Sequence, residues 1–99
     1  MEDTKIIELY WRRDESAIDE TDRKYGRSCR SIAYDILSSR EDSEECVNDT
    51  YMASWNSIPL CRPSKLPAYL YRVTRNICFD RVKKRLASKR GGGETAVVL

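Results

Sequence analysis

The sequence predicts an all-α protein, folded as a compact bundle of three to four helices. Apolar residues recur three or four positions apart along most of the chain, which is the spacing of one helix face. Two prolines, Pro59 and Pro63, fall between two such periodic segments, where they end one helix and precede the next. With 99 residues, 40% of them apolar, the chain is long enough for one modest core.

The first two predicted helices make up the N-terminal part of the bundle. One runs from Thr4, a candidate N-cap, to about Arg13, and we expect Trp11 to cover the edge of the core. The next runs from about Glu15 to Leu37. Its glycine, Gly26, costs about 1 kcal/mol relative to alanine and indicates close helix packing. Ser38, Ser39 and Arg40 are expected to form a short break.

The third predicted helix begins near Asp42 and ends at about Trp55 or Asn56. Five acids and no base occur within residues 41–49. Acids in a first turn suit the helix dipole, which is the simplest explanation for the early ones. Asp49 and Met52 lie further along the same exposed face, so we interpret this face as a small surface for docking a protein.

The last predicted helix runs from Ser64, a candidate cap, to Arg90, with Pro67 in its first turn. A stiff connector, residues 57–63, precedes it and either forms a pocket or only separates two helices. Four apolar residues share the buried face: Leu66, Leu70, Val73 and Ile77. The opposite face carries Arg72, Arg75, Phe79, Lys83 and Arg85, with Tyr69 and Tyr71 on the flanks.

Charge is distributed unevenly between these segments. Residues 1–61 hold eight basic and fourteen acidic side chains, whereas residues 62–90 hold ten basic residues and one acid, Asp80. A helix that is basic on one face and studded with aromatic residues is suited to a polyanion. Ordinary solvated helices interleave charges of both signs, so the shortage of acids here favours nucleic acid over a merely solvated face.

Nucleic-acid binding would assign roles to particular side chains of the last helix. Its Lys and Arg residues would neutralise phosphates. Tyr69 and Tyr71 would stack on unpaired bases, unless they only edge the core. Asn76 would read a base edge or, alternatively, bind a neighbouring backbone group.

Enzymatic chemistry is not expected. The sequence has no histidine, no paired CxxC cysteines, no P-loop and no dinucleotide-binding glycine motif, so we predict no enzyme activity, no cofactor and no metal. The four cysteines are interpreted as structural thiols, with redox sensing as the alternative.

The domain organisation follows from the end of the chain. Residues 1–90 are expected to form one helical domain, and residues 91–99, GGGETAVVL, a flexible linker toward a missing C-terminal domain. No apolar run approaches the roughly 20 residues of a membrane span, and the acidic N-terminus is unlike a signal peptide. We therefore expect a cytoplasmic protein.

The order of three segments resembles a known family. The stretch DSEECVNDTYMASW, the loop IPLCRP and the stretch LPAYLYRVTRNICFDRVKKR are similar to region 2 of the sigma-70 family of bacterial RNA polymerase sigma factors, in particular to the extracytoplasmic-function (ECF) group. The likeness extends from about Asp14 to Arg90. Two positions depart from the usual pattern: Tyr69 replaces a common Trp, and Asn48-Asp49 replaces Gln-Glu.

This resemblance implies a role in starting transcription. It implies that the third helix docks on the clamp helices of the largest subunit of core RNA polymerase. Residues 57–65 would capture a flipped base of the promoter minus-ten element, and the chain from Tyr69 onward would recognise and melt that element. An anti-sigma factor is a further partner of many such proteins.

Charge and resemblance together give two sets of expected site residues. The DNA-binding set is Arg62, Ser64, Lys65, Tyr69, Tyr71, Arg72, Arg75, Asn76 and Lys83. The polymerase-binding set is Asp42, Glu45, Asn48, Asp49 and Met52. Two other functions remain open: a general single-stranded nucleic-acid-binding module, and an interaction module whose basic helix binds an acidic protein.

Overall fold

The computed structural model describes residues 1–89, with side chains described as far as residue 87. Within this range the chain forms four α-helices: α1 (Asp3–Trp11), α2 (Ser16–Leu37), α3 (Arg40–Ser57) and α4 (Leu66–Lys89). The all-α prediction is confirmed. The expected linker, residues 91–99, and the last residue of the expected domain lie outside the described part of the chain.

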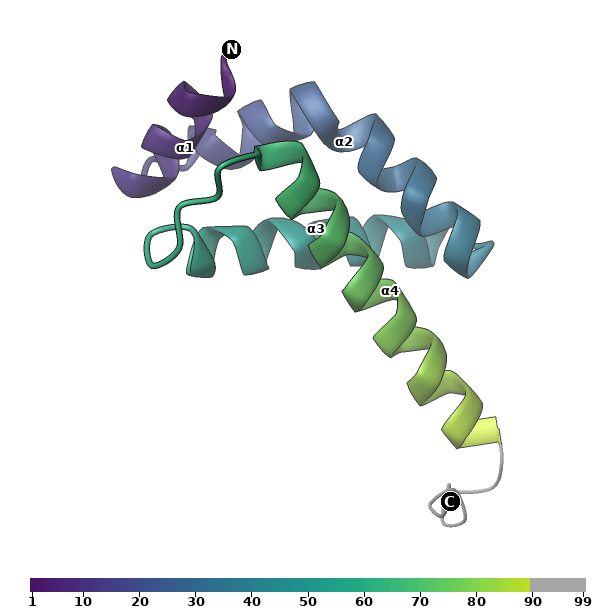
Figure 1. Cartoon of the computed structure of the whole chain (residues 1–99). Coiled ribbons are helices and arrows are strands. Elements are labelled where there is room, and N and C mark those ends of the chain that lie inside the picture. The colour runs from purple at the N-terminus through teal and green to yellow at the C-terminus, as the bar shows by residue number, and fades with distance from the viewer. Residues whose placement is uncertain (90–99) are drawn as a thin grey trace.

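The helices are arranged around the pair α2 and α3, and α4 crosses this pair (Figure 1). The short helix α1 packs against α2. The C-terminal half of α4 extends past the other helices, so more of its circumference faces solvent there (Figure 1). None of the helices in the described range is long and apolar enough to cross a membrane.

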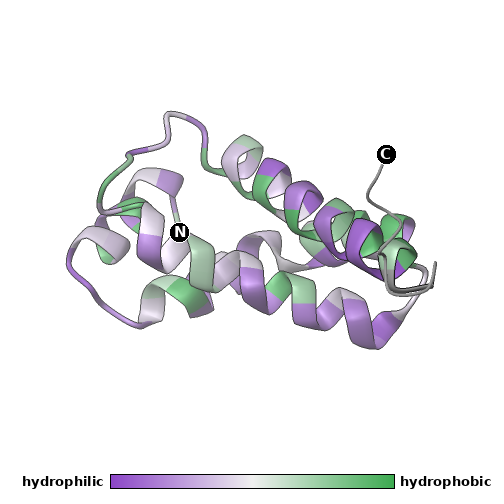
Figure 2. Cartoon of the chain, turned by 90° about the horizontal axis from the view of Figure 1, so that it is seen from below, coloured by the Kyte–Doolittle hydropathy of each residue, from purple (hydrophilic) through white to green (hydrophobic). Residues whose placement is uncertain are grey.

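The core lies where the four helices meet. Hydrophobic and hydrophilic residues alternate along every helix, as expected for helices buried on one side only (Figure 2). The largest fully buried apolar side chains come from α1, α3, α4 and the residue that follows α3: Ile6, Tyr10, Val47, Ile58, Leu66 and Leu70. Cys29, Cys46 and Cys78 are also fully buried and carry free thiols, as predicted for core cysteines.

Polar groups in this core are paired. The Tyr10 hydroxyl lies 2.6 Å from Thr21 Oγ1, and Thr50 Oγ1 lies 3.1 Å from Thr74 Oγ1. Each of the three threonine hydroxyls also donates to the carbonyl four residues earlier in its helix. Among the described residues, no buried side-chain nitrogen or oxygen lacks a hydrogen-bond partner. Polar residues therefore occupy the core without the cost of an unsatisfied group.

Three helix starts differ from the prediction. Helix α3 begins at Arg40 because Ser39 is its N-cap, with Ser39 Oγ accepting from the Asp42 amide at 3.2 Å. Ser38, in the left-handed region at φ 54°, ends α2, so the break is only two residues long. Helix α1 begins at Asp3 after Glu2, so Thr4 is not a cap.

The start of α4 is the third difference. The carbonyl of Lys65 accepts the Tyr69 amide at 3.1 Å, so Lys65 occupies the cap position and Ser64 lies one residue outside the helix. Pro67 does fall in the first turn, as predicted. Amide hydrogens in the first turn of a helix have no hydrogen-bond partner within the helix. Proline has no amide hydrogen, so Pro67 removes no hydrogen bond from α4.

Candidate functional site

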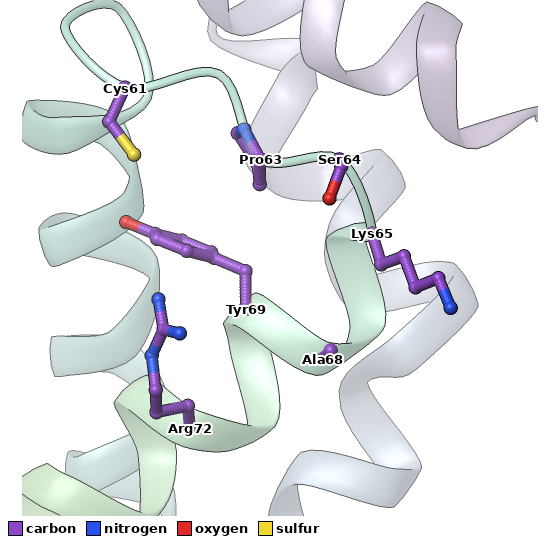
Figure 3. Close-up of a pocket in the computed structure, with 7 residues that line it drawn as sticks. All are labelled: Cys61, Pro63, Ser64, Lys65, Ala68, Tyr69 and Arg72. Atoms are coloured by element: carbon purple, nitrogen blue, oxygen red, sulfur yellow. The ribbon is translucent and has the colours of Figure 1, made fainter.

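A pocket of about 270 Å³ lies between the connector and the first turns of α4 (Figure 3). The Tyr69 ring projects toward Cys61, and the Arg72 guanidinium lies on the other side of the ring, while Lys65 points away from both (Figure 3). The guanidinium carbon of Arg72 is 5.8 Å from the centre of the Tyr69 ring, within cation–π distance. The lining residues are Cys61, Pro63, Ser64, Lys65, Ala68, Tyr69 and Arg72.

The sequence of the connector explains why this pocket forms. The amides of Leu60 and Cys61 both donate to the carbonyl of Ser57, so the chain turns once more after α3. Ile58 is fully buried and fixes this turn to the core. Pro63 then holds the chain extended until Leu66, also fully buried, begins α4. The connector is thus anchored at both ends and stands away from the bundle between them.

The outer face of α4 continues from the pocket as a basic surface. Arg72, Arg75, Asn76 and Lys83 are exposed, and Phe79 among them is 51% exposed. Within residues 1–87, neither Arg72, Arg75 nor Lys83 forms an ion pair, so their charges are available to a ligand. The structure therefore brings together Ser64, Lys65, Arg72, Arg75 and Asn76, with Lys83 further along the same face. Tyr69 is only 8% exposed and reaches this surface as part of the pocket wall.

Two residues of the expected DNA-binding set lie apart from this surface. Tyr71 follows Tyr69 by two positions, which is about 200° around the helix. Its ring is half-buried and packs edge-on against Tyr25 of α2, with the ring centres 6.3 Å apart. Arg62 belongs to the connector but does not line the pocket. Its guanidinium carbon lies 5.3 Å from the ring of Trp11.

The solvent face of α3 carries the second expected set. Asn48, Asp49 and Met52 are exposed, and Met52 is 53% exposed although it is apolar. On the other side of the helix, Cys46, Val47, Thr50, Tyr51 and Ser54 are buried. One side of α3 is therefore buried and the other is exposed, and Asn48, Asp49 and Met52 on the exposed side are accessible to a binding partner.

Asp42 and Glu45 instead contact α4. Arg85 Nη2 lies 2.6 Å from Asp42 Oδ2, and Arg81 Nη1 lies 2.8 Å from Glu45 Oε1 and 3.3 Å from Asp42 Oδ1. The hydrogen bond from Arg85, together with the charges of both arginines, lowers the pKa of Asp42. Two acids of the expected docking surface thus already have cationic partners within the bundle.

Comparison with known proteins gives the family. Residues 22–87 match the family model described as Sigma-70 region 2. The match covers α3, the connector, and most of α2 and α4. This chain belongs to the sigma-70 region 2 family. The predicted family is confirmed, and helix α1 precedes the matched segment.

One curated relative is consistent with the ECF group. The sigma region 2 domain is 25% identical over 67 residues to the "ECF RNA polymerase sigma factor SigE" of Mycolicibacterium smegmatis, covering 68% of this chain and 26% of the relative. The chain therefore spans about a quarter of that relative's length. No solved structure matches the chain.

Sequence reasoning missed two features of the sigma region 2 domain. Trp11 was expected to cover the edge of the core, and the structure leaves it 47% exposed, whereas its neighbour Tyr10 is fully buried. The ion pairs between α3 and α4 were also not foreseen. Arg81 and Arg85 are four residues apart, and Asp42 and Glu45 are three residues apart, so each pair lies on one face of its helix. This matched spacing of opposite charges is the signal in the sequence that could have predicted the ion pairs.

Proposed function

We propose that this sigma region 2 domain binds core RNA polymerase through α3 and recognises and melts the minus-ten element of promoters through the connector and α4. The observation that carries the proposal is the pocket beside Tyr69 and Arg72, which continues along α4 to Arg75 and Lys83; within residues 1–87 these three basic side chains form no ion pair. The proposal involves no covalent chemistry, and it places the domain with the polymerase in the cytoplasm.

The DNA side of the proposal depends on capture of one unpaired base. A pocket of about 270 Å³ is smaller than a typical drug-binding cavity, and a single base is a ligand of suitable size. Stacking on an aromatic ring contributes about 1–3 kcal/mol per base, which offsets the few kcal/mol needed to take a base out of a duplex. Arg72 beside the ring would hold the adjoining phosphate, and Arg75 and Lys83 would follow the strand along α4.

The polymerase side depends on the exposed part of α3. Asn48, Asp49 and Met52 combine a carboxylate, an amide and an exposed apolar side chain, a mixture suited to a protein partner. DNA would be repelled by the acids of this face. The clamp helices of the largest subunit are the partner that the family resemblance suggests, and an anti-sigma factor stays an expectation from the same source.

Removal of arginines from α4 tests the DNA side. We expect Arg72→Ala with Arg75→Ala to weaken binding of a single-stranded minus-ten oligonucleotide and to reduce the slope of log K against log salt by about 1.4, because two phosphate contacts are lost at about 0.7 each. Fluorescence anisotropy at several salt concentrations measures this slope. Arg27→Ala, which removes an exposed arginine of α2, is the matched control and should leave the slope unchanged.

Two results would contradict the assignment. An unchanged salt slope in the double variant would show that these arginines are not on phosphates. Equal affinity for promoter and scrambled oligonucleotides would instead indicate a general single-strand-binding module, and no oligonucleotide binding at all would favour an interaction module for an acidic protein.

A further inference from the structure

Trp11 is unusual among the aromatic residues of α1. Tyr10 is fully buried and hydrogen-bonded, whereas Trp11, the last residue of the helix, leaves 47% of its surface open to solvent. Large aromatic side chains normally contribute to stability by burial. A tryptophan that is half open therefore has surface available for a ligand, although a single exposed residue alone would not identify one.

The neighbours of Trp11 indicate the kind of ligand. Arg62 of the connector lies over the Trp11 ring at 5.3 Å, and the next residue, Pro63, lines the pocket. The end of α1 and the pocket are thus connected through one residue of the connector. Unpaired bases stack on aromatic rings and on guanidinium planes, and Trp11 with Arg62 offers both.

The end of α1 is also fixed in place. Arg13 adopts φ 58°, and its Nη1 donates to the Trp55 carbonyl of α3 at 2.6 Å. The same guanidinium lies 3.9 Å from the centre of the Trp55 ring. This double contact attaches the turn after α1 to α3, so Trp11 is presented from a rigid support.

Charge in this region is positive and available. Arg12, Arg62 and Lys65 are exposed, and within residues 1–87 none of them forms an ion pair. Two acids lie close to Arg12. Glu8 lines a shallow pocket together with Arg12, and the pKa of Asp14 is lowered by hydrogen bonds from the amide and hydroxyl of Ser16 and also by the charge of Arg12. Arg12 and Arg62 can therefore bind phosphates without breaking an ion pair among the described residues, and the contact that Arg62 already makes is with the Trp11 ring.

We propose that Trp11, Arg12 and Arg62 form a second contact for single-stranded DNA, in which Trp11 stacks on an unpaired base and the two arginines bind the flanking phosphates. This inference rests on the proposed function, because the strand it binds is the one that occupies the pocket. It extends the DNA surface beyond the segment that matches the family, onto α1.

The test compares two exposed aromatic residues in the full chain. The probe is a fluorescent oligothymidylate of about twelve nucleotides, a length suited to a small single-strand-binding module. We expect Trp11→Ala to weaken its binding about ten-fold or more, as loss of one stacked base implies. Tyr34→Ala is the matched control, because Tyr34 is 52% exposed on α2, and it should bind as the unmodified chain does.

A second measurement avoids any change at Trp11. In a Trp55→Phe variant Trp11 is the only tryptophan, and its fluorescence should be quenched when the oligothymidylate binds. Absence of quenching, or an unchanged affinity in Trp11→Ala while Arg72→Ala binds weakly, would overturn the second contact and leave the proposed function intact. An equal loss of duplex binding in Trp11→Ala would also overturn it, since a paired base cannot stack on Trp11. If the oligothymidylate does not bind the unmodified chain, the second contact is overturned, whereas the proposed function is tested separately by the minus-ten oligonucleotide.

Discussion

Gly26 permits an ion pair along α2 that another residue would obstruct. Asp22 and Arg30 are eight residues apart, which corresponds to about 12 Å along a helix. Arg30 Nη2 nevertheless lies 2.7 Å from Asp22 Oδ1, and the two side chains meet over Gly26. The Tyr51 hydroxyl of α3 donates to the same Asp22 oxygen at 2.7 Å, and Arg30 Nε reaches Glu44 of α3 at 2.9 Å. The atoms that a Cβ at Gly26 would meet first belong to Asp22 and Arg30 of α2 itself, so the glycine makes room for this ion pair, and the ion pair in turn contacts α3.

Gly26→Ala tests this explanation. Alanine in a helix usually stabilises by about 1 kcal/mol relative to glycine. Here its Cβ would meet Asp22 Oδ1 and lie 2.7 Å from Arg30 Nη1, so the pair must separate. We expect a net loss of about 1 kcal/mol in the free energy of unfolding, since the hydrogen bond from Tyr51 to a charged group is disturbed as well. Urea denaturation measures it.

The matched control for this prediction places the same change in an Asp22→Ala background. With the ion pair and the Tyr51 hydrogen bond already absent, Gly26→Ala should stabilise by about 1 kcal/mol. If Gly26→Ala instead stabilised the otherwise unmodified chain, the ion pair between Asp22 and Arg30 would contribute nothing measurable to stability.

At the scale of helices, α3 and α4 are joined by the ion pairs of Asp42 and Glu45 with Arg81 and Arg85. These contacts lie where α4 leaves the rest of the bundle, and they explain why its C-terminal half keeps its direction (Figure 1). They also divide the acidic face of α3 into two parts. Glu45 and Asp42 serve the fold, whereas Asn48, Asp49 and Met52 stay open.

The ion pairs predict a dependence of stability on pH. The bond from Arg85 and the charges of Arg85 and Arg81 lower the pKa of Asp42 in the folded chain below its ordinary value of 3.8. Because the folded pKa is lowered, ionised Asp42 stabilises the folded chain fully at pH values above 3.8. This stabilisation is lost as the pH falls through the folded pKa. We expect Asp42→Asn to unfold at a lower temperature than the unmodified chain at pH about 6, with a smaller difference at pH about 2.

Melting curves at the two pH values check this prediction. Asp35→Asn is the matched control, because Asp35 is exposed on α2 and forms no ion pair within residues 1–87. It should leave the melting temperature nearly unchanged at both pH values. A difference between Asp42→Asn and the unmodified chain that stays constant across this range would mean that Asp42 acts through packing rather than charge.

For the molecule as a whole, local patterns were enough to predict the helices but not their contacts. Spacing of apolar residues predicted the four helices, because a helix in a small bundle must bury one side. On α4 the predicted buried face is only partly right: Leu66 and Leu70 are buried, Val73 and Ile77 are half-buried, and Tyr69, Thr74 and Cys78 are buried instead. The first residues of the helices were less predictable, because several neighbouring residues could have served as the cap where the structure uses Ser39 and Lys65. Caps depend on one or two hydrogen bonds that the sequence alone does not reveal.

The candidate site was predictable to a similar extent. Exposure of Arg72, Arg75, Asn76, Lys83 and the outer residues of α3 follows from helix geometry alone. The position of Tyr71 against Tyr25, and of Arg62 against Trp11, depends on which helix lies alongside. Such contacts arise from tertiary packing, which residue spacing does not determine.

The central claim is that two surfaces of this domain, the exposed part of α3 and the basic face of α4, have different partners. Retention on immobilised core RNA polymerase tests it most directly, with Asp49→Lys as the decisive variant. We expect the unmodified chain, the Arg72→Ala, Arg75→Ala double variant and the charge-matched control Asp35→Lys to be retained. The Asp49→Lys variant should no longer be retained on the polymerase, because a reversed charge on the exposed face of α3 repels the partner. Its circular dichroism spectrum should be that of the unmodified chain. Retention of Asp49→Lys at the level of the unmodified chain would contradict the account.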